Sequence, residues 1–247
     1  IDARVITPLY GHIDRTHLRR GAATPVVSLA GKTFEGWLWH DDTLHMTFVD
    51  LPGLLDRAHN YGGPDGDYPD NPLRFAAFCK VAASLWSEAD VLHLHDWQSG
   101  LTAMYLGGRR PVLLTVHNLA YQGLCGFEWA DRLGIPHALR SFDGVEYYGR
   151  ISLLKAGPVL ADRLTTVSPT YAREMLTREG GHGLEDFLGH RARHFHGILN
   201  GLGEGQRSPG TDRHLAANYD VNDLSGKHRC RAALLSEVGL RTNYGEP

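Results

Sequence analysis

The sequence predicts an α/β protein with a doubly wound, mostly parallel sheet, and three observations carry this prediction. Short apolar runs alternate with helical patterns along most of the chain. Two of these runs, Val91–His95 and Pro111–Val116, flank a helical pattern at Asp96–Leu106, which is the order of a βαβ unit. Polar residues follow the apolar runs, at the strand ends where such sheets bind ligands.

The first part of the chain predicts strands that precede the first helix. The fourth of these runs alternates apolar and polar positions, as a half-buried strand does. The runs are Ala3–Thr7, Pro25–Ala30, Thr33–His40 and Leu44–Leu51. A loop rich in Gly, Pro and Asp follows at 60–72. A helix is then expected from Pro72 to about Trp86, with Asn71 as its N-cap.

The second half predicts further strand–helix units. Ser168 and Pro169 mark the start of one helix, and Gly239 marks the end of the last one. The expected elements are helices at Ile151–Leu160, Thr170–Thr177 and Ser225–Val238, and strands at Arg163–Val167 and Phe195–Leu199.

The composition is that of a globular protein and argues against several classes of partner. Of the 247 residues, 42% are hydrophobic and 21% are charged. No run approaches ~18 apolar residues, so no membrane partner is expected. The net charge of −3 and the lack of a basic run argue against nucleic acid. Three cysteines (Cys79, Cys125, Cys230) are too few and too scattered for a disulfide framework or a zinc knuckle, and are expected to be free thiols.

The common cofactor and nucleophile signatures are missing from the sequence. It has no GxxxxGK[ST], no GxGxxG and no GxSxG string. We therefore expect no cofactor and no resident metal ion.

His93, His95 and Asp96 form the first cluster with chemical potential. Alternate residues of a strand point to the same side, so the two histidines share a face. Three interpretations are open: a ligand pair of a metal-dependent hydrolase, two structural histidines, or a polar site in which Asp96 accepts hydrogen bonds from hydroxyls. Because Asp96 begins a helix, it also suits an anionic N-cap.

A second set of polar residues follows the next apolar strand in one short loop. A sugar needs many donors and acceptors, and this loop supplies them. The set comprises His117, Asn118, Tyr121 and Gln122. The alternative is a loop histidine whose hydrogen bonds its neighbours satisfy. Asn200 and Gly201 similarly follow a predicted strand. Lys155, in the predicted helix at Ile151–Leu160, is interpreted as a surface lysine with a buried stem.

Six strings stand in the order and spacing of one protein family. They are HLHDWQSGL, LLTVHNLAYQG, ISLLKAG, TTVSPTYAREM, GHGLEDFL and ILNGL. With them the chain resembles bacterial glycogen synthases and plant starch synthases from about Val5 to Gly239. The resemblance implies the N-terminal Rossmann-like domain of a GT-B fold at 1–221, lacking its first βα unit. It also implies a helix and linker at 222–247 that lead toward an absent C-terminal nucleotide-binding domain.

Three residues depart from the family pattern. Gln98 stands where the family usually has His, and Gly203 stands where it has Asp. Arg207 occupies the place expected for Trp. These departures put the contacts of the turn after Asn200 in question, although not Asn200 itself.

The resemblance also implies roles for individual residues. His117 and its backbone carbonyl would lie beside the transferred glucose, Asp96 would hold sugar hydroxyls near the acceptor, and Asn200 would touch glucose or phosphate. Tyr121 and Gln122 would shape the acceptor cleft. The remaining substrate-binding residues are His95, Asn118 and Gly201.

The implied activity is transfer of glucose from ADP-glucose, or UDP-glucose, to a growing α-1,4-glucan with retention of configuration. This chain would be an incomplete and inactive part of such an enzyme, located in a bacterial cytoplasm or a plant plastid. One alternative is a non-catalytic glucan-binding module. A second is a metal-dependent hydrolase that uses His93 and His95.

Overall fold

The chain divides into two compact units, Ile1–Leu199 and Asn200–Pro247. The computed structural model describes residues 1–86, 88–201, 203 and 208–240. Each unit is described by itself, and the domain boundary expected after residue 221 stays a prediction.

The first sheet of unit 1 is mixed. Its strand order is β1-β6-β5-β2, and only the β1–β6 pair is parallel. The strands are β1 (Val5–Pro8), β2 (Arg19–Arg20), β5 (Trp37–Asp41) and β6 (Met46–Asp50). Two small hairpins accompany this sheet: β3 (Val26–Leu29) with β4 (Lys32–Glu35), and β7 (Gly62–Gly63) with β8 (Gly66–Asp67).

The single strand expected at Thr33–His40 is wrong, because two strands occupy it. β4 pairs with β3, whereas β5 pairs with β6, so the two segments have different partners. The chain changes partner at Gly36, whose N–H donates to the carbonyl of Pro25.

Helix α1 (Asn71–Leu85) follows the Gly- and Pro-rich loop and is almost entirely buried. Its N-cap is Asp70, so the expected Asn71 cap is wrong by one residue. The Asn71 side chain instead donates to the carbonyl of Tyr61 at 2.7 Å. Arg74, fully buried, donates to the carbonyls of Leu54 and Asn60. The start of α1 thus holds the preceding loop in place.

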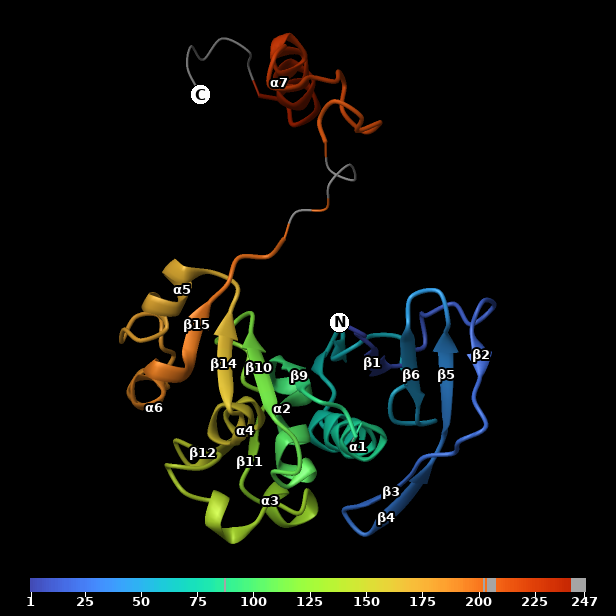
Figure 1. The fold of residues 1–247 in the computed structure, drawn as a ribbon, viewed down its shortest axis with the longest axis vertical. Coiled ribbons are helices and arrows are strands. Elements are labelled where there is room, and N and C mark those ends of the chain that lie inside the picture. Colours follow the sequence, from blue (N-terminus) through green and yellow to red (C-terminus); the bar gives the residue numbers. More distant parts are fainter. Residues whose placement is uncertain (87, 202, 204–207, 241–247) are drawn as a thin grey trace. The chain divides into compact units, whose positions relative to one another are not determined.

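The second sheet of unit 1 is fully parallel, with the order β15-β14-β10-β9 (Figure 1). Its strands are β9 (Leu92–His95), β10 (Val112–Val116), β14 (Arg163–Thr166) and β15 (Phe195–Gly197). Helix α2 (Asp96–Leu106) connects β9 to β10 and packs between α1 and α4 (Leu153–Leu160). The predicted βαβ unit is therefore confirmed, but the description "mostly parallel" holds for this sheet only.

A small antiparallel sheet precedes α4 and was not predicted. Its order is β11-β13-β12, from Leu124–Gly126, Arg150–Ser152 and Glu146–Tyr147. The helix expected from Ile151 begins only at Leu153, because residues 150–152 pair with both neighbouring strands. Ser152 caps α4 by accepting the N–H of Lys155.

Lys155 is 1% exposed, so its interpretation as a surface lysine is wrong. Its Nζ donates to the carbonyl of Phe142 and, at 2.8 Å, to that of Glu146. Burial lowers the pKa of Lys155, because the ammonium loses water. This lysine ties α4 to the segment that leads into β12.

Three short helices and two 3₁₀ turns complete unit 1. Ser168 caps α5 by accepting the N–H of Tyr171, as expected. The helices are α3 (Trp129–Arg132), α5 (Pro169–Glu174) and α6 (Glu185–His190), and the 3₁₀ turns are η1 (His137–Leu139) and η2 (Ala192–His194).

Unit 2 contains α7 (Ser225–Glu237), close to the expected helix. Gly239, with φ +70°, follows its end. Cys230 on α7 contacts the carbonyl of Ala217, and Cys79, Cys125 and Cys230 are all free thiols.

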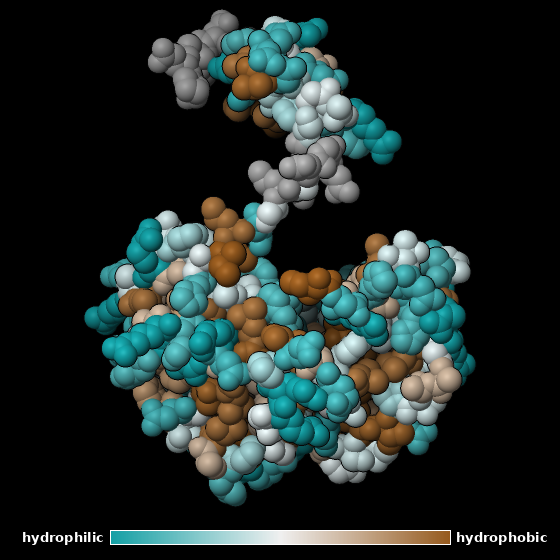
Figure 2. Space-filling model, viewed as in Figure 1, coloured by the Kyte–Doolittle hydropathy of each residue, from teal (hydrophilic) through white to brown (hydrophobic). Residues whose placement is uncertain are grey.

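The surface of unit 1 mixes hydrophobic and hydrophilic side chains on the face drawn in Figure 2. Among the described residues, no helix is long and apolar enough to cross a membrane.

Candidate active site at the carboxyl edge of the parallel sheet

Two parallel strands bring the polar residues of the middle of the chain together. β9 ends at His95, which pairs with Thr115 of β10. Asp96 follows the first strand and His117 follows the second. Because the strands are parallel neighbours, both residues lie at the same edge of the sheet. The prediction that these two clusters meet at one edge is confirmed.

Asp96 binds His117 with both carboxylate oxygens. Oδ1 accepts the backbone N–H of His117 at 2.7 Å, and Oδ2 lies 2.9 Å from Nδ1 of the same residue. The N-cap of α2 is His95, and no side chain caps the helix. The N-cap interpretation of Asp96 is therefore wrong: its carboxylate reaches across to the next strand.

The backbone of Asp96 is held in a disfavoured conformation, with φ +54°. Such a conformation costs most residues other than Gly about 1–2 kcal/mol, and Asp adopts it more readily than most. Observed strain of this kind is concentrated at functional sites. Here it directs the carboxylate toward β10.

The contact with Asp96 determines how the His117 ring is presented. Oδ2 is an acceptor, so Nδ1 carries the hydrogen and Nε2 has a free lone pair when the ring is neutral. Nε2 has no hydrogen-bond partner among the described residues, and the side chain is 42% exposed. His117 can therefore offer Nε2 to a ligand.

The rings of His93 and His95 lie side by side, tilted by 33°, and His95 lies in the same way beside His117, tilted by 34°. The ring centroids are 4.3 Å apart between His93 and His95 and 5.4 Å between His95 and His117. Burial lowers the pKa of both His93 and His95, and repulsion from neighbouring histidines lowers it further. The shared face of the two histidines is thus confirmed, and the lowered pKa values favour the neutral form of both rings.

His93 also has a structural partner inside the sheet. Its Nε2 lies 2.7 Å from Thr115 Oγ1, which lies 2.6 Å from Thr165 Oγ1. In the described part of the chain, no group of three His, Cys, Asp or Glu side chains is arranged to hold a metal ion. The metal-hydrolase hypothesis gains no support from this geometry.

The loop after His117 places its polar residues in different surroundings. Asn118 Oδ1 accepts the N–H of Ala120 at 3.0 Å, so part of its side chain serves the turn. Tyr121 is 67% exposed. Gln122 is only 5% exposed, and its Nε2 donates to the carbonyl of His182 at 3.2 Å. Tyr121 faces solvent, whereas Gln122 holds the loop to a distant segment.

The remaining residues of this loop contact two aromatic side chains, Tyr171 and Trp97. The hydroxyl of Tyr171, on α5, accepts the N–H of Leu119 at 3.0 Å. Gly123, with φ +60°, lies so close to the ring of Trp97 that any larger residue would collide with it. Sequence reasoning missed Tyr171, because the string VSPTYAREM showed only a capped helix.

Four of the residues singled out by the sequence lie in unit 2 or outside the described residues. Asn200, Gly201 and Gly203 belong to unit 2, and their roles beside His117 stay predictions. Arg207 lies outside the described residues. Gln98 lies on α2, where its backbone carbonyl accepts the thiol of Cys79.

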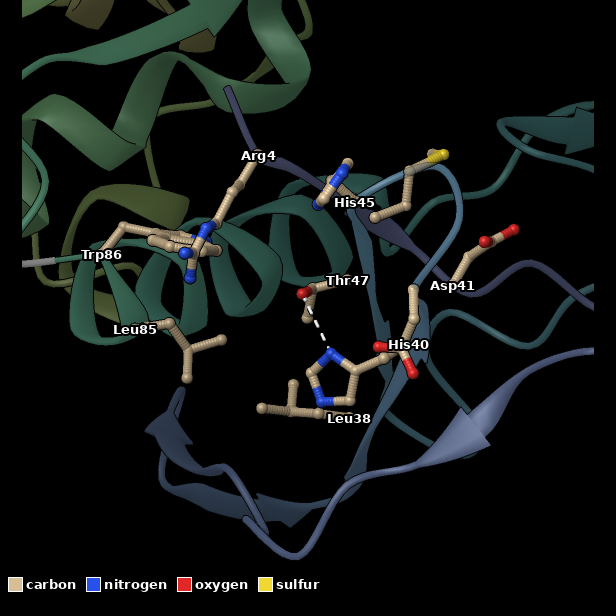
Figure 3. Close-up of a pocket in the computed structure, with 10 residues that line it drawn as sticks. Arg4, Leu38, His40, Asp41, His45, Thr47, Leu85 and Trp86 are labelled. Carbon is tan, nitrogen blue, oxygen red and sulfur yellow. Dashed lines mark hydrogen bonds between the residues drawn. The ribbon is translucent and has the colours of Figure 1, made fainter. Parts of the chain in front are cut away.

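A different pocket of unit 1, of about 290 Å³, is lined by the β5–β6 turn and the end of α1. Figure 3 shows the Arg4 guanidinium beside the Trp86 ring and His40 pointing toward Thr47. Its Asp41 accepts the N–H groups of its own turn, at Thr43 and Leu44. Because that carboxylate is already bound locally, we place the candidate site at Asp96 and not here.

Comparison with known proteins identifies the family of this chain. Residues 1–190 match the model of the starch synthase catalytic domain. The chain belongs to that family. The glycogen synthase of Roseobacter denitrificans is 40% identical over 97% of this chain and 53% of its own length. That of Rhodopseudomonas palustris (strain HaA2) is 46% identical over 81% of this chain and 44% of its own length.

A solved structure shows the same fold. The catalytic domain of starch synthase IV from Arabidopsis thaliana, bound to ADP and acarbose, superposes with a TM-score of 0.80 at 27% identity. The match covers 98% of this chain and 53% of the plant chain. The chain thus spans about half the length of the relatives that it matches, and the expected resemblance to glycogen and starch synthases is confirmed.

Proposed function

We propose that this chain is the acceptor-side half of a retaining glucosyltransferase that extends an α-1,4-glucan from ADP-glucose. One observation supports this most strongly: Asp96 holds His117 at the carboxyl edge of the parallel sheet and leaves Nε2 free. The family membership supports it independently, because its relatives are glycogen and starch synthases.

The reaction requires little covalent chemistry from the protein. The bond between C1 of glucose and the β-phosphate oxygen of ADP breaks, and a bond forms between C1 and the 4-hydroxyl oxygen of the glucan end. The hydroxyl proton passes to the leaving phosphate. The protein must position both sugars and stabilise charge that develops at C1 and phosphate.

His117 and Asp96 suit the positioning of the transferred glucose. Nε2 of His117 accepts a hydrogen bond from a sugar hydroxyl, while Asp96 keeps the ring in one tautomer and one orientation. The lowered pKa values of His93 and His95 disfavour a positive charge behind this ring. We assign Asn200 and Gly201 to the donor side, with Asn200 touching glucose or phosphate.

A hollow next to Trp97 suits the glucan. It measures about 570 Å³ and is lined by His12, the segment at 58–63 and residues 66–67. Tyr61 in this wall packs against Trp97, with ring centroids 6.0 Å apart, and Trp97 follows Asp96 directly. Histidine, asparagine and backbone groups there offer the donors and acceptors that sugar hydroxyls require.

The test is ADP release by the full-length protein with maltoheptaose as acceptor. With ADP-glucose we expect ADP release and a glucan lengthened by α-1,4-linked glucose. The donor preference follows from comparing this rate with the rate of UDP release when UDP-glucose is the donor. Binding of maltoheptaose without any ADP or UDP release would instead identify a glucan-binding module. Absence of both binding and release would overturn the proposal.

A further inference from the structure

Tyr148 occupies a backbone position that its residue type disfavours. Its φ is +47°, and together with Gly149 (φ +77°) it forms the two-residue loop between β12 and β13. Two consecutive positive φ values are the pattern of a type I′ turn, which prefers Asn, Asp or Gly at its first position. A bulky residue there is uncommon and requires an explanation.

The Tyr148 side chain contributes little to the core of unit 1. It is 77% exposed. Its ring meets Tyr147 edge to face, with centroids 4.8 Å apart. It also lies against Gly183, where an added Cβ would come within 2.9 Å of it. The ring is therefore held from the side while most of its surface stays open to solvent.

A second hairpin shows that the turn does not need a tyrosine. β3 and β4 are also joined by a two-residue loop, Ala30 (φ +53°) and Gly31 (φ +70°). The same backbone is thus built elsewhere in unit 1 with a methyl side chain. The geometry of the turn therefore does not by itself account for Tyr148.

The hairpin is fastened to the candidate active site through one carbonyl group. His182 accepts both the hydroxyl of Tyr147, at 2.5 Å, and Nε2 of Gln122, at 3.2 Å. Gln122 belongs to the loop that follows His117. His182 itself has φ +48°. The hairpin that carries Tyr148 is therefore tied, through the hydroxyl of Tyr147, to the loop expected to line the acceptor cleft.

The base of the hairpin is fastened as well. The buried ammonium of Lys155 donates to the carbonyls of Glu146 and Phe142. Glu146 Oε1 also accepts the N–H of Gly149, which closes the turn. An exposed aromatic ring on so firmly held a base loses little further freedom on binding a ligand.

We propose that Tyr148 is a distal subsite for the glucan acceptor, where a glucose ring of the α-1,4-glucan packs its C–H face on the tyrosine ring. The inference rests on the proposed function and adds to it a residue that binds the chain away from the reacting end. Tyrosine suits this contact because it combines a large apolar face with a polar tip and few rotatable bonds.

The experiment compares matched turn variants of the 247-residue chain. Maltoheptaose is titrated into the parent chain, Tyr148→Asn, Tyr148→Phe and Ala30→Asn, and the Kd is measured by calorimetry. Tyr148→Asn should raise the Kd by ~3–10-fold, which is the loss of one aromatic contact. Tyr148→Phe keeps the ring face and should remain within about 2-fold of the parent chain, and Ala30→Asn should leave the Kd unchanged.

Thermal unfolding separates this effect from damage to the fold. Asn suits a positive φ better than Tyr, so Tm of Tyr148→Asn should stay constant or rise. Ala30 packs in part against the core, so Ala30→Asn is used as a turn control only if its Tm stays close to that of the parent chain. Should Tyr148→Asn fail to fold, Tyr148→Gly replaces it, because Gly adopts the same φ freely. A lower affinity in a variant that is at least as stable as the parent would support the subsite.

Two results of the binding experiment would overturn the subsite, and neither depends on turnover. One is an equal Kd for Tyr148→Asn and the parent chain. The other is an equal loss of affinity in Ala30→Asn, which would attribute the effect to the turns and not to the ring. In the full-length protein, Tyr148→Asn should raise KM for maltoheptaose and leave KM for ADP-glucose unchanged. ADP release with an unchanged maltoheptaose KM would preserve the proposed function and overturn the subsite alone.

Discussion

Unit 1 contains two clusters in which histidine and aspartate gather at strand ends. The turn cluster consists of His40 and Asp41, the last two residues of β5, and His45, which directly precedes β6. The edge cluster consists of Asp96 and His117, after β9 and β10. Each contains a residue other than Gly at positive φ, His45 at +53° and Asp96 at +54°. Residue types and backbone strain are therefore similar in the two clusters.

The two clusters differ in where the carboxylate finds its partner. Asp41 accepts the N–H groups of Thr43 and Leu44, two and three residues further on. Asp96 instead binds His117, 21 residues away and on another strand. The first arrangement builds a turn, whereas the second holds a side chain in position and leaves Nε2 available. Asp41 also lies 3.6 Å from Nε2 of His17 on a distant segment, so the contrast is that Asp41 accepts the N–H groups of its own turn, whereas Asp96 binds both the backbone and the ring of one histidine.

The largest expected effect comes from the free ring of the edge cluster. In the full-length protein, His117→Ala should lower kcat by ~10²–10³-fold, as the loss of one transition-state contact does. The matched change in the turn cluster, His40→Ala, should leave kcat near normal. Steady-state ADP release and thermal unfolding are measured on both variants. A near-normal kcat with a lowered Tm in His117→Ala would show that the edge cluster also has a structural and not a catalytic role.

Asp96→Asn tests whether the carboxylate acts by orienting His117. The amide keeps the shape and one acceptor, but it can turn an N–H toward Nδ1 and so favour the other tautomer of the ring. We expect kcat to fall by ~10–10²-fold, less than in His117→Ala, because the ring remains. Nitrogen chemical shifts of His117 report the tautomer directly. An altered tautomer with unchanged kcat would contradict this role.

Asp41→Ala should affect stability and not ligand binding. It removes the acceptor of two turn N–H groups. The free energy of unfolding should drop by about 1–2 kcal/mol, measured by urea denaturation. Asp41→Asn retains an acceptor oxygen and should recover most of the loss. If Asp41→Ala weakened maltoheptaose binding, the contrast between the two clusters would fail.

The smallest expected effect is the pH dependence of stability due to His93 and His95. Their pKa values are lowered in the folded chain, chiefly by burial, so the unfolded chain binds protons more readily. Stability is therefore full above the ordinary histidine pKa of ~6.5 and decreases as the pH falls below it. Urea unfolding from pH 8 to pH 5 measures this slope. His93→Gln should reduce the change of the unfolding free energy with pH. If that change stayed the same, the pH dependence would come from other groups.

Much of the parallel sheet could be predicted because its signals are local. Val91–His95, Asp96–Leu106 and Pro111–Val116 correspond to β9, α2 and β10 within a residue at each boundary. The Ser168 cap was likewise predictable, since it needs only neighbouring residues. The antiparallel β11-β13-β12 sheet was missed, because its strands have only two or three residues and because β11 pairs with β13 across a long intervening segment.

The sequence by itself determined the family, the alternation of strands and helices, and the location of polar residues after β9 and β10. These follow from residue order, apolar periodicity and turn chemistry, which act over a few residues. Only the tertiary structure decided which atoms meet. The parallel register of β9 and β10 joins Asp96 to His117, and packing around α4 buries Lys155. The contact of Asp96 with His117 and the burial of Lys155 depend on segments that are distant in sequence, so no local pattern specifies them.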